Sequence, residues 1–167
     1  MKNMTREEKI ILEINTNPGI RFRELMKSMK ITNGVMSYYI QKLEKTGVVN
    51  TERTSGVLRL FSETIETSDM TILKFLRIST PKKIIVLLME EDSLTFKQIT
   101  ERIQMSPSTT SFYLAKLIHA EILSISEVLP RRYLLNNKQR LTNLITLYYP
   151  SVIDTSSENL ADIFSSD

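Results

Sequence analysis

The sequence predicts a mainly α-helical fold with small β wings, of the α+β class, built twice in one chain. Three observations predict it. Residues 5–50 and 79–124 match at a constant offset of 74 positions, and each copy has apolar residues at helical spacing. Each copy also ends in a short stretch of strand-forming residues around a turn. Because 167 residues leave room for two small domains, the repeat predicts a tandem arrangement.

The repeat is carried by its apolar positions more than by identity. Conservative substitutions such as Ile14 to Leu88 and Ile40 to Leu114 fill the positions between the identical ones. This agreement is typical of one fold used twice, whereas a solenoid needs at least three shorter repeats. The identical pairs include Lys9/Lys83, Ile10/Ile84, Ile11/Ile85, Phe22/Phe96, Ser37/Ser111, Tyr39/Tyr113, Lys42/Lys116 and Leu43/Leu117.

Each copy is predicted to begin with an amphipathic helix. In the first copy, Ile10 and Ile14 lie one helical turn apart, and Asn17-Pro18-Gly19 predicts the turn that ends the helix. In the second copy, Thr80-Pro81 predicts the start of the helix, because a capping threonine followed by proline suits a helix N-terminus.

Two further helices are predicted in each copy. A short helix is expected at about residues 21–29 and 95–103, followed by a turn. A third helix is expected at about residues 33–46 and 107–120. Ser106-Pro107 again predicts a cap followed by proline at the first helical position.

A β-hairpin is predicted to follow the third helix. Residues 48–62 contain strand formers on both sides of Thr54-Ser55-Gly56, and residues 122–135 contain a turn near Pro130. Three helices with a terminal hairpin form a winged helix-turn-helix domain. The sequence therefore predicts two such domains in tandem.

The segments outside the copies also have apolar patterns. Residues 63–79 contain an apolar stripe at helical spacing and are expected to pack as a helix, and a further helix is expected around residues 141–148. The predicted organisation is a first domain at residues 1–66, a helical linker at 67–79, a second domain at 80–138 and a helical C-terminal extension at 139–167.

The last part of the chain is acidic and weakly amphipathic. Residues 149–167 contain four Asp or Glu and no Lys or Arg. Apolar side chains there must pack either on the chain's own second domain or on a second copy, so both an intramolecular cover and a homodimer contact are expected alternatives. The apolar residues concerned are Val152, Ile153, Leu160, Ile163 and Phe164.

These motifs resemble those of archaeal-type transcriptional regulators that carry two winged helices of the MarR/ArsR-like kind in one chain. The resemblance covers about residues 5–149. It implies double-stranded DNA as the partner. The residues that carry it are Asn17-Pro18-Gly19-Ile20, Phe22-Arg23-Glu24-Leu25, Asn33-Gly34, Leu43-Glu44-Lys45-Thr46-Gly47-Val48-Val49, Thr80-Pro81-Lys82-Lys83-Ile84, Met105-Ser106-Pro107 and Ser111.

The third helix of each copy is the candidate reading element. In the first copy, Met36, Ile40 and Leu43 form a stripe that should be buried, which leaves the polar side chains outward. Asn and Gln can bind adenine, and Lys can reach guanine or phosphate. Wing arginines suit the phosphates or the minor groove. The candidate DNA-binding residues are Asn33, Ser37, Tyr38, Gln41, Lys42, Lys45, Arg53, Arg59, Ser106, Ser108, Ser111, Phe112, Lys116, Arg131 and Arg132.

The second copy has a less polar reading face. Ala115 stands where the first copy has Gln41, and His119 stands where it has Lys45. This face has less capacity for hydrogen-bond readout. The second copy is expected either to retain DNA contacts through its wing arginines or to have changed toward packing and partner binding.

Composition excludes several functional classes. The chain has no cysteine and one histidine, which excludes disulfides and thiolate sites and argues against a histidine-rich metal site. No phosphate-binding glycine loop or catalytic motif is present, so no enzyme activity and no cofactor are expected. The start MKNMTREEKI lacks the pattern of a signal peptide, and no apolar run approaches the roughly 18 residues of a membrane span, so a cytoplasmic protein with no membrane partner is expected.

Two functions from different classes fit this sequence. The first is a sequence-specific double-stranded DNA-binding transcription regulator, with the third helix in the major groove and wing arginines on the backbone or minor groove. The alternative is a tandem winged-helix adaptor in a transcription or other complex, with weak DNA binding or none. The net charge of +3 is compatible with both.

Overall fold

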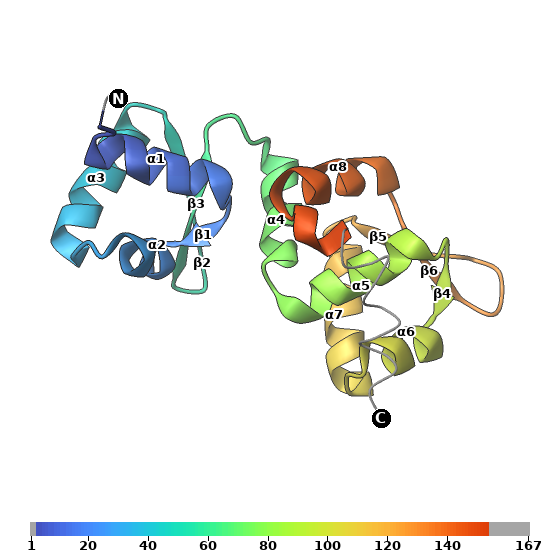
Figure 1. The fold of residues 1–167 in the computed structure, drawn as a ribbon. Helices are drawn as coiled ribbons and strands as arrows, with labels where there is room; N and C mark the ends of the chain where they lie inside the picture. The colour runs from blue at the N-terminus through green and yellow to red at the C-terminus, as the bar shows by residue number, and fades with distance from the viewer. Residues whose placement is uncertain (1–2, 154–167) are drawn as a thin grey trace. The chain divides into compact units, whose positions relative to one another are not determined.

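The computed structural model describes residues 3–153, which form two compact units with the boundary between Leu73 and Lys74 (Figure 1). The first unit contains three helices and three strands: α1 (Arg6–Thr16), β1 (Ile20–Arg21), α2 (Phe22–Met29), α3 (Asn33–Lys45), β2 (Val49–Thr54) and β3 (Val57–Ser62). Helix α4 (Thr67–Leu76) spans the boundary. The second unit contains α5 (Ser79–Glu90), β4 (Leu94–Thr95), α6 (Phe96–Ile103), α7 (Pro107–His119), β5 (Leu123–Ile125), β6 (Arg132–Leu135) and α8 (Lys138–Tyr148).

Local backbone and side-chain features fix where α1 begins and where α2 ends. The Thr5 amide donates to Glu8 Oε2 at 2.7 Å, and the Glu8 amide donates to Thr5 Oγ1 at 3.2 Å, which forms a capping box at α1. At the C-terminal end of α2, Lys30 adopts a left-handed conformation with φ of 53°. This residue allows the chain to turn sharply into α3, since a left-handed residue is a common way to end a helix.

The first unit closes around one apolar core. Ile10 and Ile14 of α1, Leu25 of α2 and Leu60 of β3 are completely buried. The α3 stripe of Met36, Ile40 and Leu43 is also buried, as its spacing predicts. Burial of this stripe fixes the rotation of α3, so its polar residues must face away from the core.

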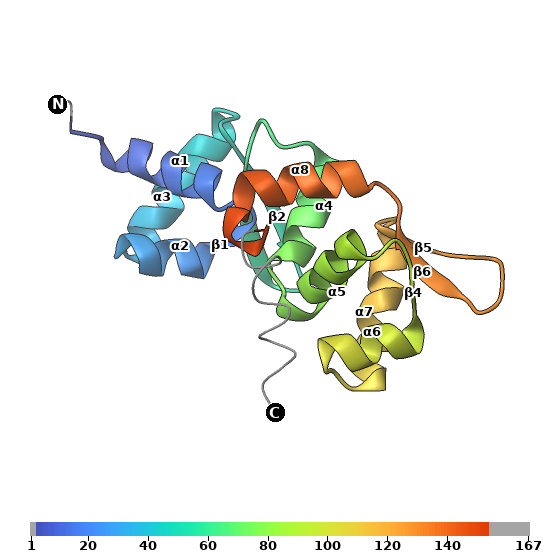
Figure 2. The same cartoon turned by 45° about the vertical axis from the view of Figure 1, so that its right-hand side comes forward.

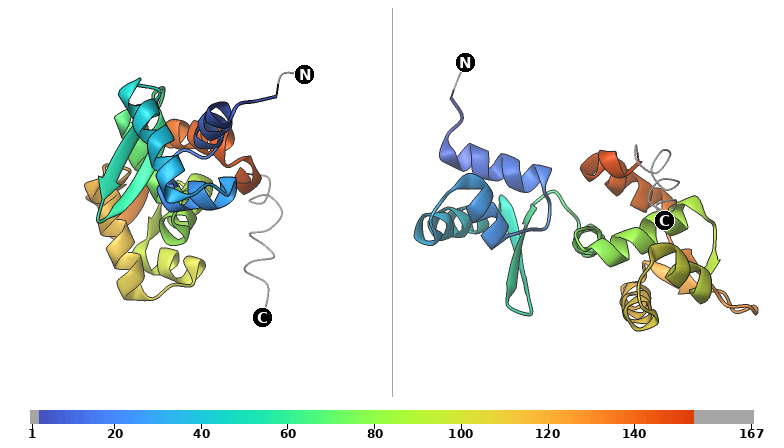
Figure 3. Two further views of the ribbon diagram at one scale, coloured as in Figure 1. Left: turned by 90° about the vertical axis from the view of Figure 1, so that its left-hand side faces the viewer. Right: turned by 60° about the horizontal axis from the view of Figure 1, so that its bottom comes forward.

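Each unit contains a three-stranded antiparallel sheet. The strand order is β1-β3-β2 in the first unit and β4-β6-β5 in the second. The β2–β3 hairpin is the wing of the first unit, and Figure 3 (right) shows it extending beyond the helices. The sequence predicts only the hairpin strands. Each unit also contains a two-residue strand that pairs with the hairpin: β1 pairs with β3, and β4 pairs with β6. Because this strand leads directly into α2 or α6, it connects the wing to the helices.

The second unit repeats the arrangement, but its first helix begins earlier than predicted. Helix α5 starts at Ser79 with Ile78 as the N-cap and no side-chain cap bond, so Thr80 is not the capping residue and Pro81 is not at the first helical position. A capping box joins Thr95 to Gln98 at the start of α6, and Ser106 Oγ accepts from the Thr109 amide at 3.2 Å at the start of α7. Pro107 occupies the first turn of α7, as predicted. Figure 2 shows α8 beside α5 in this unit. The mainly helical fold with two tandem winged helix-turn-helix domains is therefore confirmed.

The segments that flank the winged helices are helical where the structure describes them. In α4, Leu73 and Leu76 are fully buried, and in α8, Leu141 and Ile145 are buried. No helix among residues 3–153 is long and apolar enough to cross a membrane. The predicted contacts of Leu160, Ile163 and Phe164 fall outside the described residues.

Candidate nucleic-acid interface

A groove of about 800 Å³ lies on the surface of the first unit. Three parts of the fold form its walls: the β1–α2 junction, the outward side of α3 and the β2–β3 wing. Three of the predicted DNA-contacting residues on α3, and one on the wing, meet in this groove. The lining residues are Arg21, Phe22, Arg23, Asn33, Ser37, Ile40, Gln41, Glu44, Thr51, Arg53, Gly56, Val57 and Leu58.

Amide and hydroxyl groups line the helix wall of the groove. Asn33, Ser37 and Gln41 lie at i, i+4 and i+8 along α3, so they share one face. The Ser37 hydroxyl donates to Asn33 Oδ1 at 3.2 Å. This contact orients the Asn33 amide at the first turn of α3, while the Gln41 side chain is exposed about two turns farther along. The wall therefore presents donors and acceptors at fixed spacing.

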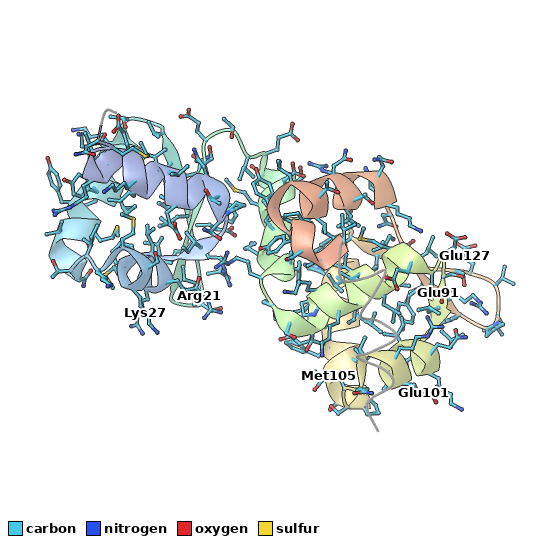
Figure 4. The ribbon with its side chains drawn as sticks, in the orientation of Figure 1. Arg21, Lys27, Glu91, Glu101, Met105 and Glu127 are labelled. Carbon is cyan, nitrogen blue, oxygen red and sulfur yellow. The ribbon has the colours of Figure 1, made fainter. Side chains whose placement is uncertain are left out.

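Three arginines surround these polar groups. Arg53 comes from the wing, and Arg21 and Arg23 come from the start of α2. All three are exposed, and Figure 4 shows Arg21 leaving the edge of the unit at α2. A guanidinium offers planar donors that match phosphate oxygens. The arginine groups therefore make the rim of the groove suited to a polyanion.

Arg21 and Arg23 are missing from the sequence-based candidates. They precede and begin α2, outside the third helix and the wing on which the prediction concentrated. The pairing of Arg21 with Arg59 across β1 and β3 places Arg21 beside the wing, and Arg23 follows in the first turn of α2. The signal available in the sequence is the Arg-Phe-Arg pattern, in which the apolar residue packs on the core and the two flanking cations face solvent.

One carboxylate also lines the groove. Glu44 Oε1 accepts a hydrogen bond from the Thr51 hydroxyl on β2. This contact links the last turn of α3 to the wing. It therefore helps to set the separation of the two walls.

Lys42 is paired within the first unit. The sequence predicts a DNA contact, but the Lys42 ammonium donates to Glu7 Oε2 of α1 at 2.5 Å, and Lys42 does not line the groove. The hydrogen bond to Glu7, followed by the charge of that carboxylate, raises the pKa of Lys42. The residue ties α3 to α1 beside the groove, and its DNA contact stays a prediction.

Arg59 requires a correction. Its side chain is only 9% exposed, and Nη1 donates to the Gly19 carbonyl oxygen at 2.9 Å. The sequence places Arg59 on the wing correctly, but the pairing of β3 with β1 turns its side chain into the unit. Arg59 therefore fastens the wing to the turn before β1, and it does not present its charge to DNA.

The second unit contains the equivalent bond. Arg132 Nη1 donates to the Ser93 carbonyl oxygen at 3.1 Å, and Ser93 aligns with Gly19 in the repeat. In both units the arginine faces the second residue of the short edge strand, Arg21 in one and Thr95 in the other. Arg132, predicted as a DNA contact, is partly buried and donates to the backbone, and its DNA contact stays a prediction.

The remaining candidates on α3 lie outside the groove lining. Tyr38 is 63% exposed, and its ring meets the edge of Tyr39 with centroids 5.5 Å apart. Lys45 is exposed in the last turn of the helix. Both residues are accessible to a partner that covers α3.

The second reading face is less polar than the first. The positions of Asn33, Gln41 and Glu44 are taken by Pro107, Ala115 and Ile118, as the repeat alignment shows. The predicted residues on α7 remain accessible: Ser108 and Ser111 are exposed and Phe112 is 53% exposed.

Two predicted residues of the second unit have contacts within α7. The Lys116 ammonium lies 4.6 Å from the centroid of the Phe112 ring, a cation–π contact. Ser106 is engaged as the N-cap of α7 through its bond to Thr109. Arg131 is exposed in the loop before β6. Of the two arginines predicted as wing contacts in this unit, Arg131 is therefore the exposed one.

Within residues 3–153 there is no group of three or more His, Cys, Asp or Glu arranged to hold a metal ion. Buried side-chain nitrogen and oxygen atoms in the same range all have hydrogen-bond partners.

Comparison with known proteins gives a match in each half of the chain. The family model for winged helix-turn-helix DNA-binding domains matches residues 5–50, and the model for bacterial regulatory proteins of the arsR family matches residues 79–124. These ranges differ by 74 residues at both ends, the offset of the repeat. The matches support a DNA-binding regulator with two winged helix-turn-helix domains.

Among solved structures, HlyU from Vibrio cholerae N16961 is similar at a TM-score of 0.43 and 21% identity, over 50% of this chain and 98% of that one. No curated protein matches the chain.

Proposed function

We propose that the protein is a sequence-specific double-stranded DNA-binding transcription regulator that inserts α3 into the major groove. The observation that carries the proposal is the groove of the first unit, where Asn33, Ser37 and Gln41 line the helix wall and arginines stand on the rim. An α-helix fits the major groove of B-DNA, and phosphates then lie on both sides of the helix. The groove offers base-reading groups in the middle and phosphate-binding groups around them.

The amides supply the base readout. An Asn or Gln side chain can accept from adenine N6 and donate to N7, which is the usual bidentate pairing with that base. The hydrogen bond from the Ser37 hydroxyl occupies one lone pair of Asn33 Oδ1. The Asn33 amide nitrogen can therefore still donate, and the second lone pair of the oxygen can still accept. The preferred site of the first unit is therefore expected to contain adenines at the positions that Asn33 and Gln41 reach.

The arginines supply most of the affinity. Contacts with phosphates release counterions, and each contact steepens the salt dependence of binding. Arg21 and Arg23 would bind the strand on one side of α3, and Arg53 on the wing would bind the strand on the other side, because they lie on different walls of the groove. The residues position the helix without selecting a sequence.

The second unit has a different role in this proposal. Without the amides of the first unit, α7 would contact DNA through hydroxyl groups and the apolar surface of Phe112, which suits thymine methyl groups. The unit would add contacts and fix the orientation of the chain on its site. A homodimer that brings four winged helices to one site remains a further proposal, and light scattering at several concentrations tests it.

The test compares two double variants that remove equal charge from the first unit. Arg23→Ala with Arg53→Ala removes two cations of the groove, and Arg6→Ala with Lys9→Ala removes two exposed cations from α1. Binding to a genomic pool of duplexes is measured by gel shift and by fluorescence anisotropy. The groove variant should lower the log–log salt slope by about 2, and the α1 variant should leave it unchanged.

Equal losses from the two variants would mean that only net charge matters, and the groove would not be the interface. A wild-type chain that binds neither genomic nor random duplexes at micromolar concentration would favour the adaptor function.

A further inference from the structure

The two wings differ in the loops at their tips. In the first unit only Ser55 and Gly56 separate β2 from β3. In the second unit six residues, 126–131, separate β5 from β6. This segment, called the second wing loop below, has the sequence Ser-Glu-Val-Leu-Pro-Arg, and Figures 1, 2 and 3 show it standing clear of the rest of its unit. The loop is therefore an addition to the repeated fold.

The tip of the second wing loop is apolar and exposed. Val128 is 77% exposed and Leu129 is 80% exposed, and Pro130 follows them in the exposed class. Single exposed apolar residues are ordinary on protein surfaces, but three consecutive ones at the end of a projecting loop are not explained by packing within the unit. The tip therefore has the properties of a surface that is covered by a partner.

The base of the loop is closed by hydrogen bonds. The Ser126 amide donates to the Arg132 carbonyl oxygen at 2.8 Å, and the Arg132 amide donates to Ser126 Oγ at 2.9 Å. The Ser126 hydroxyl also donates to the Val128 carbonyl oxygen at 3.2 Å. The side chain of Arg132 ties the same strand to the backbone at Ser93. These bonds constrain the base of the loop, so less entropy is lost when the tip is inserted into a partner.

The charges next to the tip indicate how a nucleic acid would be engaged. Arg131 is exposed on one side and Glu127 on the other, where Figure 4 labels it. Because their charges cancel, the loop as a whole gains little from attraction to phosphates. Its apolar tip with one adjacent arginine matches the combination by which proteins enter the minor groove, where an apolar side chain wedges between base pairs and arginine contacts the groove.

We propose that the second wing loop enters the minor groove and inserts Leu129 between two stacked base pairs, which kinks the DNA. This inference rests on the proposed function, since it concerns the same duplex. Val128 and Pro130 cover the opened base step, and Arg131 contacts the floor or wall of the minor groove. The kink is favoured at pyrimidine–purine steps such as TA and CA, because these steps unstack with least cost. The second unit thereby contributes to sequence preference through deformability, although its helix lacks the amides of the first.

The experiment measures DNA bending by the full chain. Duplexes from the bound genomic pool carry a fluorescence donor and acceptor at their ends, and the energy transfer gives the bend angle. The wild-type chain is expected to bend the duplex by about 20–90°, the range of wedge-inserting proteins. The double variant Val128→Ser with Leu129→Ser should bind with little or no bend. The matched control is Leu147→Ser, which alters an apolar residue on α8 that is 68% exposed and should retain the wild-type bend.

A second measurement locates the insertion. 2-Aminopurine is placed at the purine of each TA or CA step in turn, and its fluorescence should rise at one step with the wild-type chain and at none with the double variant. Binding without a bend, or a bend that the double variant retains, would overturn the inference and leave the proposed function standing. Failure of the wild-type chain to bind any duplex would instead remove the proposed function. Loss of self-association in the double variant with an unchanged bend would identify a second copy as the partner of the loop, and would also overturn the inference.

Discussion

Arg53 and Arg59 lie on the same hairpin, but replacing each by alanine should affect different properties. The Arg59 variant should lose stability, and the Arg53 variant should lose DNA affinity. Arg59→Ala removes a buried guanidinium that donates to the Gly19 carbonyl oxygen at 2.9 Å. Loss of a buried bond to a charged group leaves the acceptor unsatisfied and costs about 1–3 kcal/mol. With a urea dependence of about 1–3 kcal/mol per molar, the unfolding midpoint should fall by about 1 M. Urea titrations followed by far-ultraviolet circular dichroism measure this shift.

Arg53→Ala is the matched control. Arg53 is exposed at the groove, so its loss should change stability by no more than about 0.5 kcal/mol. It should instead reduce the salt slope of DNA binding by about 1, the value for one phosphate contact. If Arg59→Ala left the urea midpoint unchanged and weakened DNA binding as much as Arg53→Ala, Arg59 would act on DNA and the structural role would be refuted.

Three further outcomes are expected. Gln41→Ala should reduce the binding free energy by about 1–3 kcal/mol on the preferred duplex and by little on random DNA, as measured by anisotropy. Equal losses on both duplexes would mean that Gln41 does not contact the bases. Ser37→Glu should weaken binding more than Ser111→Glu in gel shifts, because it puts a carboxylate into the polar groove; equal losses would mean that both helices read DNA alike. Lys42→Ala should leave the salt slope unchanged, since the ammonium is paired with Glu7; a slope lowered by about 1 would restore Lys42 as a phosphate contact.

The helices could be predicted from the sequence because their signals are local. Thr5 and Glu8, three residues apart, form a capping box, and Pro107 follows the capping Ser106 directly. The buried stripe of α3 follows from helical spacing alone, and so does the outward direction of Ser37 and Gln41. These features depend on residues within one or two turns of each other.

The roles of the charged residues could not be predicted in the same way, because they depend on distant partners. Gly19 and Arg59 are 40 positions apart, and Lys42 and Glu7 are 35 apart. A two-residue edge strand carries almost no sequence pattern, yet its pairing decides which wing arginine is buried and brings Arg21 to the groove. A wing arginine that faces solvent and one that faces the core therefore look alike in the sequence.

The central claim is that the first unit binds duplex DNA through its groove. The most direct measurement is fluorescence anisotropy of the full chain on duplexes selected from a genomic library, with shuffled duplexes as the control. The salt concentration is varied from about 50 to 300 mM, because an affinity that depends on several phosphate contacts falls steeply over this range. Tighter binding of the selected duplexes and a log–log slope near −0.9 per phosphate contact are expected. A flat salt dependence, or equal affinity for selected and shuffled duplexes, would contradict the claim.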